Sequence, residues 1–202
     1  INAEYGDQQR RMSVSLEMLQ KAILNLIMLK SGLTEQDIDN STEDQIKNGC
    51  LILTKQEYEE RVFYKRKDFQ FVIAKNLKKV SSCLFLGSNL QFAFMPEVEG
   101  IANCAFSYCP FTVICFLKVK CVDNHAFDSC TNLIQVFLPI CEELNNACFW
   151  NCENIKILNL PLVKSVGDSQ FYGCKSLTDL IIPSVEKIGN DCFNYCDVLN
   201  SI

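Results

Sequence analysis

The hydrophobic side chains of this chain follow two different periods, and the period changes near residue 50. In the first part the apolar positions recur at helical spacing, at Leu16, Leu19, Ile23, Leu26 and Ile27. This spacing predicts one amphipathic helix over residues 13–30, ended by Ser31-Gly32. Residues 1–11 are polar, and we expect them to be frayed rather than helical.

Two further helix starts are indicated between this helix and the second part of the chain. Residues 34–37 (TEQD) have the pattern of a capping box, and residues 41–45 (STEDQ) offer another, with Asn48-Gly49 ending a short helix. Residues 1–53 therefore form a predicted helical cap over the open end of a solenoid in the second part of the chain, because the terminal unit of a solenoid exposes its core. A separate adaptor module is the alternative interpretation.

The second part of the chain, residues 54–202, repeats one unit every 21–22 residues. Phenylalanine recurs at this spacing, at Phe63, Phe85, Phe106, Phe127, Phe149, Phe171 and Phe193. A cysteine follows three residues later in the last five copies, at Cys109, Cys130, Cys152, Cys174 and Cys196. Units of this period with an L-x-x-L-x-L segment are typical of leucine-rich repeats.

Each unit predicts a short strand followed by a turn. The later strands end at Pro139, Pro161 and Pro183, and proline cannot continue a hydrogen-bonded ladder. Stacked units predict an α/β fold: a leucine-rich-repeat solenoid with short parallel strands on the concave face, turns or short 3-10 or helical segments on the convex face, and an N-terminal α-helical cap. The last unit stops inside a repeat at Ile202, so we expect about seven units, truncated at the C-terminus.

Three segments near the C-terminus give the repeat a family likeness. They are residues 177–183 (LTDLIIP), 185–189 (VEKIG) and 192–196 (CFNYC). The pattern resembles the BspA-type leucine-rich repeats of surface and secreted proteins in bacteria and protozoan parasites. The resemblance implies a protein-binding or adhesive solenoid without catalytic activity. The first units depart from it, because Arg66 and Ser88 replace the cysteine and Lys75 replaces the proline that ends the strand.

The outward positions of the predicted strands form an apolar stripe, where the family resemblance implies small polar residues. The stripe consists of Phe71, Ile73, Phe92, Phe94, Val113, Phe137, Ile157 and Ile181. An exposed stripe with aromatic side chains predicts a face that binds a protein or peptide ligand. Two alternatives stay open. A register error of one residue would turn these side chains inward, and the N-terminal helix would cover them if it folded over the face.

The charge is unevenly distributed along the chain. The net charge of −5 argues against a nucleic-acid partner, and no uncharged apolar run is long enough to span a membrane. Residues 55–79 nevertheless carry eight basic and four acidic side chains, against six and twelve over residues 80–202. The basic set predicts a patch for an anionic partner at Arg61, Lys65, Arg66, Lys67, Lys75, Lys78 and Lys79. The alternative is that this is ordinary solvated surface.

The thirteen cysteines are better explained by packing than by disulfides. Five stack in one core column, and buried free cysteine behaves as a small hydrophobe. Free thiols favour a cytoplasmic location, whereas the family resemblance favours the cell surface, so the compartment stays undetermined. Cys83, Cys104 and His125 share one column and are residue types that bind zinc, but the column continues with Ala147, Ser169 and Asp191. We therefore predict neither a metal site nor a cofactor.

The sequence offers little for catalysis. It has one histidine and neither a nucleophile-elbow nor a phosphate-loop motif, so we predict that the protein is not an enzyme. The leading hypothesis is a non-enzymatic protein-binding or adhesive scaffold that uses its concave face. The alternative is an intracellular structural subunit that is permanently assembled through the same face.

Overall fold

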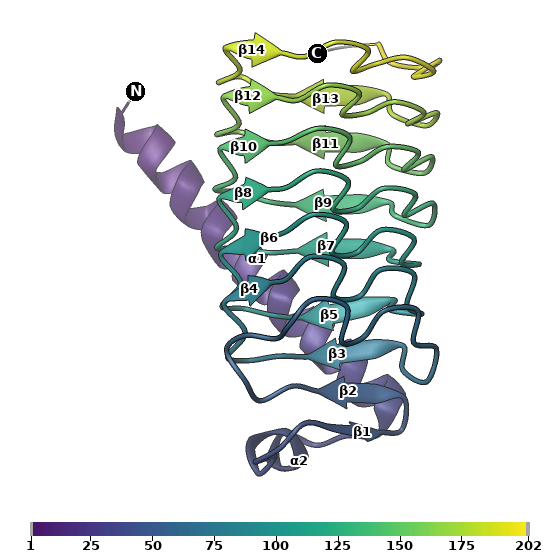
Figure 1. The fold of residues 1–202 in the computed structure, drawn as a ribbon. Helices are drawn as coiled ribbons and strands as arrows, with labels where there is room; N and C mark the ends of the chain where they lie inside the picture. Colours follow the sequence, from purple (N-terminus) through teal and green to yellow (C-terminus); the bar gives the residue numbers. More distant parts are fainter. Residues whose placement is uncertain (1, 201–202) are drawn as a thin grey trace.

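A computed structural model describes residues 2–200 of the chain, with side chains described from residue 15 onward. Residue 1 of the predicted cap and residues 201–202 of the predicted solenoid lie outside the described residues. The described chain winds into a stack of turns, with one long helix lying against one side (Figure 1). The predicted solenoid with parallel strands and an N-terminal helix is therefore confirmed.

One side of each turn contributes a three-residue strand to what we call the β3–β13 sheet. Its strands are β3 (Phe71–Ile73), β5 (Phe92–Phe94), β7 (Val113–Cys115), β9 (Gln135–Phe137), β11 (Ile157–Asn159) and β13 (Asp179–Ile181). Neighbours pair in parallel and in register, so that Phe71 lies beside Phe92, and Ile157 lies beside Asp179. The hydrogen-bonded ladder is divided between β5 and β7. These strands are the ones that the sequence predicts for the concave face.

A second parallel sheet runs along another side of the turns, and the sequence analysis missed it. It is formed by β4 (Lys79–Val80), β6 (Gly100–Ile101), β8 (Cys121–Val122), β10 (Glu143–Leu144), β12 (Ser165–Val166) and β14 (Lys187–Ile188). The second residue of each strand from β4 to β12 is buried. Two-residue strands are too short to show the alternation by which a strand is recognised in a sequence.

The core between the two sheets is built on the phenylalanine column. The seven rings stack from Phe63 to Phe193 with centroid distances of 5.3 to 6.2 Å and interplanar angles of 2° to 13°. The cysteine column lies beside them, and Cys130, Cys152 and Cys174 have no exposed surface. Each turn thus buries its apolar side chains against its neighbours, as the repeat pattern predicts.

The corners of each turn rely on left-handed backbone. The residue two positions before the repeat phenylalanine has a φ between 53° and 63° in all seven units, and it is His125 or Ala147 in the middle ones. The residue two positions after the phenylalanine also has a positive φ, with Gly87 and Gly173 in two units and Tyr108 and Ser129 in others. These corners are hard to recognise in the sequence, because most of them are not glycine.

The N-terminal region differs from the predicted cap in two respects. Helix α1 (Asn2–Ser31) begins near the chain start, where residues 1–11 were expected to be frayed. Helix α2 (Glu35–Asp39) starts at the predicted capping box, in which the Thr34 side chain accepts from the Asp37 backbone N–H. The short helix predicted after Ser41 is wrong, because this segment forms an extended hairpin.

That hairpin joins the cap to the solenoid. Strand β1 (Gln45–Lys47) pairs antiparallel with β2 (Cys50–Ile52), and β2 pairs in parallel with β3. The turn residues Asn48 and Gly49 have φ values of 51° and 73°. Asn-Gly with two positive φ values is the favoured two-residue hairpin turn, so the sequence did contain the signal for a hairpin rather than a helix end.

Candidate protein-binding face

Helix α1 lies across the β3–β13 sheet instead of covering only the end of the solenoid (Figure 1). Ile23 and Ile27, one helical turn apart, pack into a cluster with Phe71, Ile73 and Cys115 of the sheet. This apolar cluster is separate from the main core, which lies on the other side of the sheet. The sheet is therefore covered by apolar side chains on both faces along its first strands.

A buried polar contact locates α1 at the break in the sheet. The Gln20 side chain is buried, and its Nε2 donates a hydrogen bond of 3.3 Å to the backbone oxygen of Cys115 in β7. Because β5 and β7 are not hydrogen-bonded to each other, backbone carbonyl groups at this edge must accept hydrogen bonds from outside the sheet. The Cys115 thiol also lies 4.0 Å from the backbone oxygen of Leu16, one turn earlier in the helix. The helix thus takes part in the hydrogen bonding of the sheet.

The structure divides the predicted apolar stripe into a covered part and an open part. Phe71 and Ile73 are buried under α1, and Phe92, Phe94 and Val113 are half-buried against the same cluster. Phe137 is half-buried against the same cluster as well, whereas Ile157 and Ile181 are 57% and 46% exposed. The second alternative from the sequence, in which the N-terminal helix covers the face, therefore applies to the first six residues of the stripe. Ile157 and Ile181 remain accessible to a partner, and Phe137 lies at the boundary between the covered and the open part.

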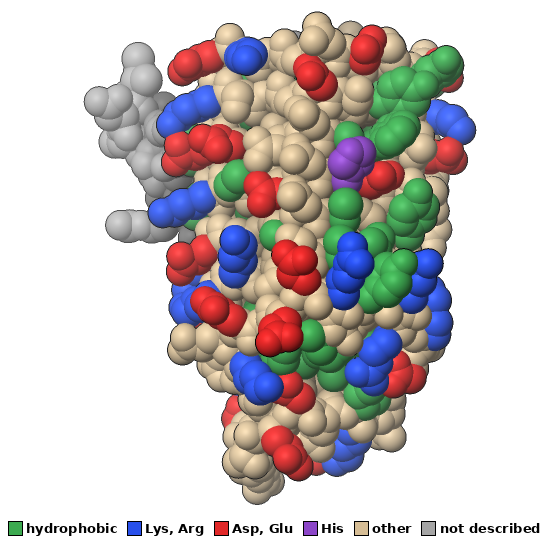
Figure 2. Space-filling view, viewed as in Figure 1, with side chains coloured by type: hydrophobic (Ala, Val, Ile, Leu, Met, Phe, Trp, Pro, Cys, Tyr) green, Lys and Arg blue, Asp and Glu red, His purple; other side chains and the backbone are tan. Residues whose placement is uncertain are grey.

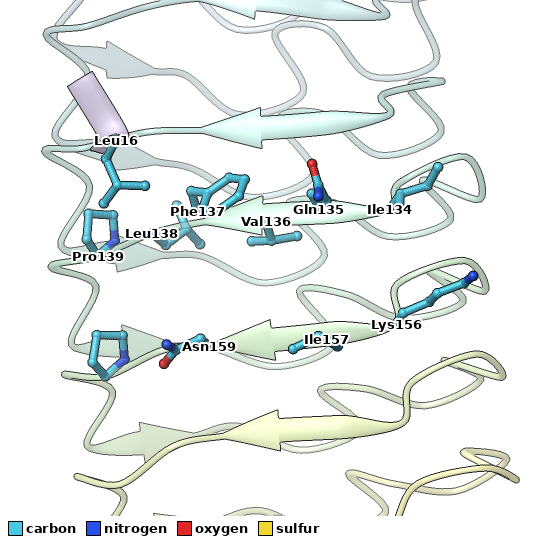
Figure 3. Close-up of a pocket in the computed structure, with 11 residues that line it drawn as sticks. Leu16, Ile134, Gln135, Val136, Phe137, Leu138, Pro139, Lys156, Ile157 and Asn159 are labelled. Atoms are coloured by element: carbon cyan, nitrogen blue, oxygen red, sulfur yellow. The ribbon is translucent and has the colours of Figure 1, made fainter. Parts of the chain in front are cut away.

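The open part of the sheet forms a groove of about 430 Å³ next to α1. Its apolar walls come from Leu16 of the helix, Phe137, Ile157, and the strand-ending prolines Pro139 and Pro161. Figure 3 shows Leu16 reaching from α1 toward Phe137 and Pro139, with the polar side chains of Gln135, Asn159 and Lys156 at the edges. The sequence analysis did not assign Leu16 or the prolines to the site, because repeat positions do not reveal where the helix docks.

The predicted basic patch is largely engaged in contacts within the chain. Arg66 pairs with Asp68 at 2.5 Å, and Lys78 pairs with Glu97 at 2.7 Å. Lys75 pairs with Asp39, and Lys67 donates to the backbone oxygen of Gly87. The contact with Lys118, followed by that with Lys78, lowers the pKa of Glu97 to about 2.

The remaining members of the patch, Arg61, Lys65 and Lys79, are exposed, and the Lys65 ammonium lies 5.0 Å from the centre of the Tyr64 ring. Figure 2 shows basic and acidic side chains interspersed over the visible face rather than a continuous basic field. An anionic partner at this end of the solenoid stays a prediction.

The thiols are free, and burial raises the pKa of most of them. All thirteen cysteines are unpaired, and burial raises the pKa of Cys109 to about 12. Burial, and then the neighbouring Asp123 carboxylate, raise the pKa of Cys121 to about 11. The His125 ring bonds through Nδ1 to Asp128 Oδ2 at 3.2 Å. Over residues 15–200, no three side chains of the metal-binding types converge on one point.

The comparisons with known proteins agree with this architecture. A model of the BspA type leucine rich repeat region matches six copies of the repeat over residues 56–175, which is more than half of the chain. The chain belongs to the BspA-type leucine-rich-repeat family. Leucine-rich-repeat scaffolds of this family are typically protein-binding and non-enzymatic. Within the described part of the chain, no helix has the length and hydrophobicity needed to cross a bilayer.

A solved structure of another leucine-rich-repeat protein shares the fold of this BspA-type chain. The T. pallidum leucine rich repeat protein TpLRR superimposes with a TM-score of 0.66 at 20% identity, over 78% of this chain and 87% of its own. A leucine-rich repeat protein from Bacteroides ovatus gives a TM-score of 0.43 at 18% identity, over 75% of this chain and 66% of its own. A leucine rich cell surface protein from Faecalibacterium prausnitzii gives 0.47 at 18%, over 80% and 54%. A search of curated proteins found no match.

Proposed function

We propose that this BspA-type repeat protein is a non-enzymatic protein-binding scaffold, and that its groove beside α1 holds a helical segment of a partner protein. The observation that carries the proposal is α1 itself. The same sheet already accepts an amphipathic helix, and the groove continues that interface past Leu16 onto β9 and β11. A partner helix would lie next to α1 and extend the layer that α1 begins.

The chemistry of the groove specifies the side chains of such a partner. Ile23 and Ile27 of α1 show that aliphatic side chains four residues apart fit the sheet. Ile157 in the groove and Ile181 on the next strand, β13, are about half exposed, and covering each one contributes roughly 1 kcal/mol to binding. Gln135 and Asn159 at the groove edge provide hydrogen-bonding groups that favour one orientation. The partner helix therefore needs leucine or isoleucine at i, i+4 and i+7.

The state of the nucleophiles supports a binding role rather than a catalytic one. A thiol acts as a nucleophile in its deprotonated form, and the raised pKa of Cys121 keeps it protonated at neutral pH. Among the described residues no serine or cysteine lines the groove, whose walls are apolar side chains, two carboxamides and Lys156. The groove, as far as the described residues define it, is thus suited to hold an apolar side chain and contains neither a thiol nor a serine hydroxyl.

Methyl NMR on the whole chain tests the proposal. The probe is a Glu/Lys-rich helical peptide of about 20 residues with leucines at i, i+4, i+7 and i+11, and its control has alanines at these positions. We expect the leucine peptide to shift the methyl signals of Ile157 and Ile181 and the alanine peptide to leave them unchanged. Ile157→Asp should weaken binding by about tenfold or more, and Val62→Asp, exposed on the first turn, should not.

Two results would overturn the proposal. The first is that the leucine peptide binds equally well to the wild type and to Ile157→Asp. The second is that the purified chain forms a stable assembly in which Ile157 and Ile181 are already protected. That outcome would instead support a subunit permanently assembled through the same face, and the molar mass from light scattering separates it from a monomeric receptor.

A further inference from the structure

A row of aromatic side chains runs along the turns of the last four described repeats, apart from the groove. It consists of His125, Trp150, Tyr172 and Tyr195, one from each successive turn. The ring centroids are separated by 5.9, 5.7 and 5.0 Å in that order. Tyr195 is 62% exposed, and the other three rings are partly exposed. Figure 2 shows hydrophobic side chains gathered along one edge of the molecule, beside the purple imidazole.

The rings of this row do not form a flat platform. The planes of Trp150 and Tyr172 meet at 88°, and those of Tyr172 and Tyr195 meet at 63°. The buried phenylalanines on the same turns, in contrast, are nearly parallel. Edge-to-face rings produce a stepped surface with notches between them. Compact apolar rings such as those of proline fit notches, whereas flat sugar rings stack best on coplanar aromatic faces.

The spacing of the row matches an extended peptide. Turns of a parallel solenoid are about 4.8 Å apart, so Trp150 and Tyr195, two turns apart, are separated by about 9.6 Å along the axis. A polyproline II helix repeats every three residues with a rise of about 3.1 Å each, which is about 9.3 Å per repeat. One repeat of the peptide is therefore about as long as the distance between the two rings. When such a segment lies along the solenoid axis, one side chain faces Trp150 and the side chain three residues later faces Tyr195.

The polar groups around the row complement such a segment. Asp191 is exposed and interacts electrostatically with Tyr172, so this end of the row carries an accessible carboxylate. Asp128 at the other end, in contrast, is buried and bonded to His125 and Ser129. The indole Nε1 of Trp150 is shielded and has no hydrogen-bond partner among the described residues. A bound peptide whose backbone carbonyl reached this N–H would satisfy the unpaired donor. Polyproline II segments keep their carbonyls free for such bonds.

We propose that the aromatic row binds a proline-rich segment in the polyproline II conformation, with prolines three residues apart over Trp150 and Tyr195 and a basic residue beside Asp191. Aromatic-lined surfaces are a recurring way of binding such segments, since the peptide is already extended before it binds. This site is independent of the groove beside α1. It remains if the helix-binding proposal fails.

Trp150 is the only tryptophan, so its fluorescence reports on the row directly. The probe is a synthetic oligoproline of about ten residues with an arginine at each end, and the whole chain is titrated with it. We expect the emission of Trp150 to shift and to saturate. Tyr195→Ala should weaken binding by about tenfold.

Tyr108→Ala is the matched control. Tyr108 has the same 62% exposure as Tyr195 and the same left-handed backbone at the same repeat position, but its ring has no aromatic neighbour among the described residues. Any change in folding caused by removing the ring from that position is thus shared by both variants. Tyr108→Ala should change the affinity by less than about twofold. Asp191→Asn should weaken the arginine-flanked peptide and leave an uncharged oligoproline unaffected.

Three outcomes would overturn the proposal. The peptide could leave the fluorescence of Trp150 unchanged at millimolar concentration. Tyr195→Ala and Tyr108→Ala could have the same affinity. A soluble oligosaccharide such as a xylan or glucan hexasaccharide could bind at Trp150 while the proline-rich peptide does not, in which case the row is a carbohydrate site instead.

Discussion

The thiol of Cys152 donates a hydrogen bond of 3.1 Å to the backbone oxygen of Phe127 in the preceding turn. The same bond recurs from Cys109 to Phe85, and from Cys174 to Phe149. A cysteine at this position therefore does two things at once. It fills the space beside the stacked phenylalanine rings, and it supplies a weak donor to a carbonyl of the neighbouring turn.

Replacing Cys152 tests both contributions. Cys152→Ala removes the donor and leaves a small cavity, so we expect the free energy of unfolding to fall by about 1–2 kcal/mol. Cys152→Ser keeps a donor and should lose less than the alanine variant, since Ser88 is fully buried at the equivalent place in an earlier turn. Urea unfolding measures both. Cys83→Ala, at a partly exposed corner, is the control and should change stability by less than about 0.5 kcal/mol.

Gly167 lies where the backbone of the previous turn passes closest. A Cβ atom at this position would be 2.6 Å from Asn146 Oδ1 and 2.7 Å from the backbone carbon of Asn145. Because backbone cannot move aside easily, we expect Gly167→Ala to lower the unfolding free energy by about 2 kcal/mol or more. Gly100→Ala is the matched control, because an added Cβ there meets nothing within 4 Å. Equal melting temperatures for the two variants would show that the close approach is not tight.

Ile27 tests whether α1 is an integral part of the fold. Its side chain is fully buried between α1 and the sheet, so Ile27→Asp buries a charge or releases the helix. We expect a loss of about 3 kcal/mol or more, together with faster amide exchange in β3, which α1 covers. Leu29→Asp, on the same helix but 81% exposed, should leave both quantities unchanged. Unchanged exchange in the Ile27→Asp variant would contradict the packing of α1 on the sheet.

Asp44 links the cap to the first repeat, and it should make stability depend on pH. Its Oδ1 accepts from the Tyr58 hydroxyl at 2.6 Å and from the Thr54 N–H at 2.8 Å. Partial burial opposes ionisation, but these hydrogen bonds outweigh it, so the pKa of Asp44 is lowered from its ordinary value of 3.8. A carboxylate with a lowered pKa stabilises the fold above its unfolded pKa, and this contribution is lost as the pH falls through the folded value.

The expected result is that wild type and Asp44→Asn differ most in unfolding free energy at neutral pH, and that the difference shrinks below about pH 4. Chemical denaturation at several pH values measures it. Glu43→Gln, the exposed neighbour, is the control. A difference that stays constant down to about pH 2 would mean that the Asp44 bonds do not depend on its charge.

The repeating part of the molecule is predictable from the sequence because every unit places the same types of residue at the same core positions. Phe149, Cys152 and Leu158 recur in register with their counterparts in neighbouring turns, so one unit and its period are enough to place the core. The apolar residues that line the β3–β13 sheet can also be identified, since alternation along a strand is a local property. The Asn48-Gly49 turn was equally available in the sequence and was misread as a helix end.

The sequence by itself thus determined the solenoid, its stacked Phe and Cys columns and the apolar character of the sheet. Only the tertiary structure decided which part of that sheet stays open, and which aromatic side chains meet in a row. The physical reason is the range of the contacts. Gln20 and Cys115 are 95 residues apart, and the docking of a helix on a sheet depends on packing over that distance, which no repeat period encodes.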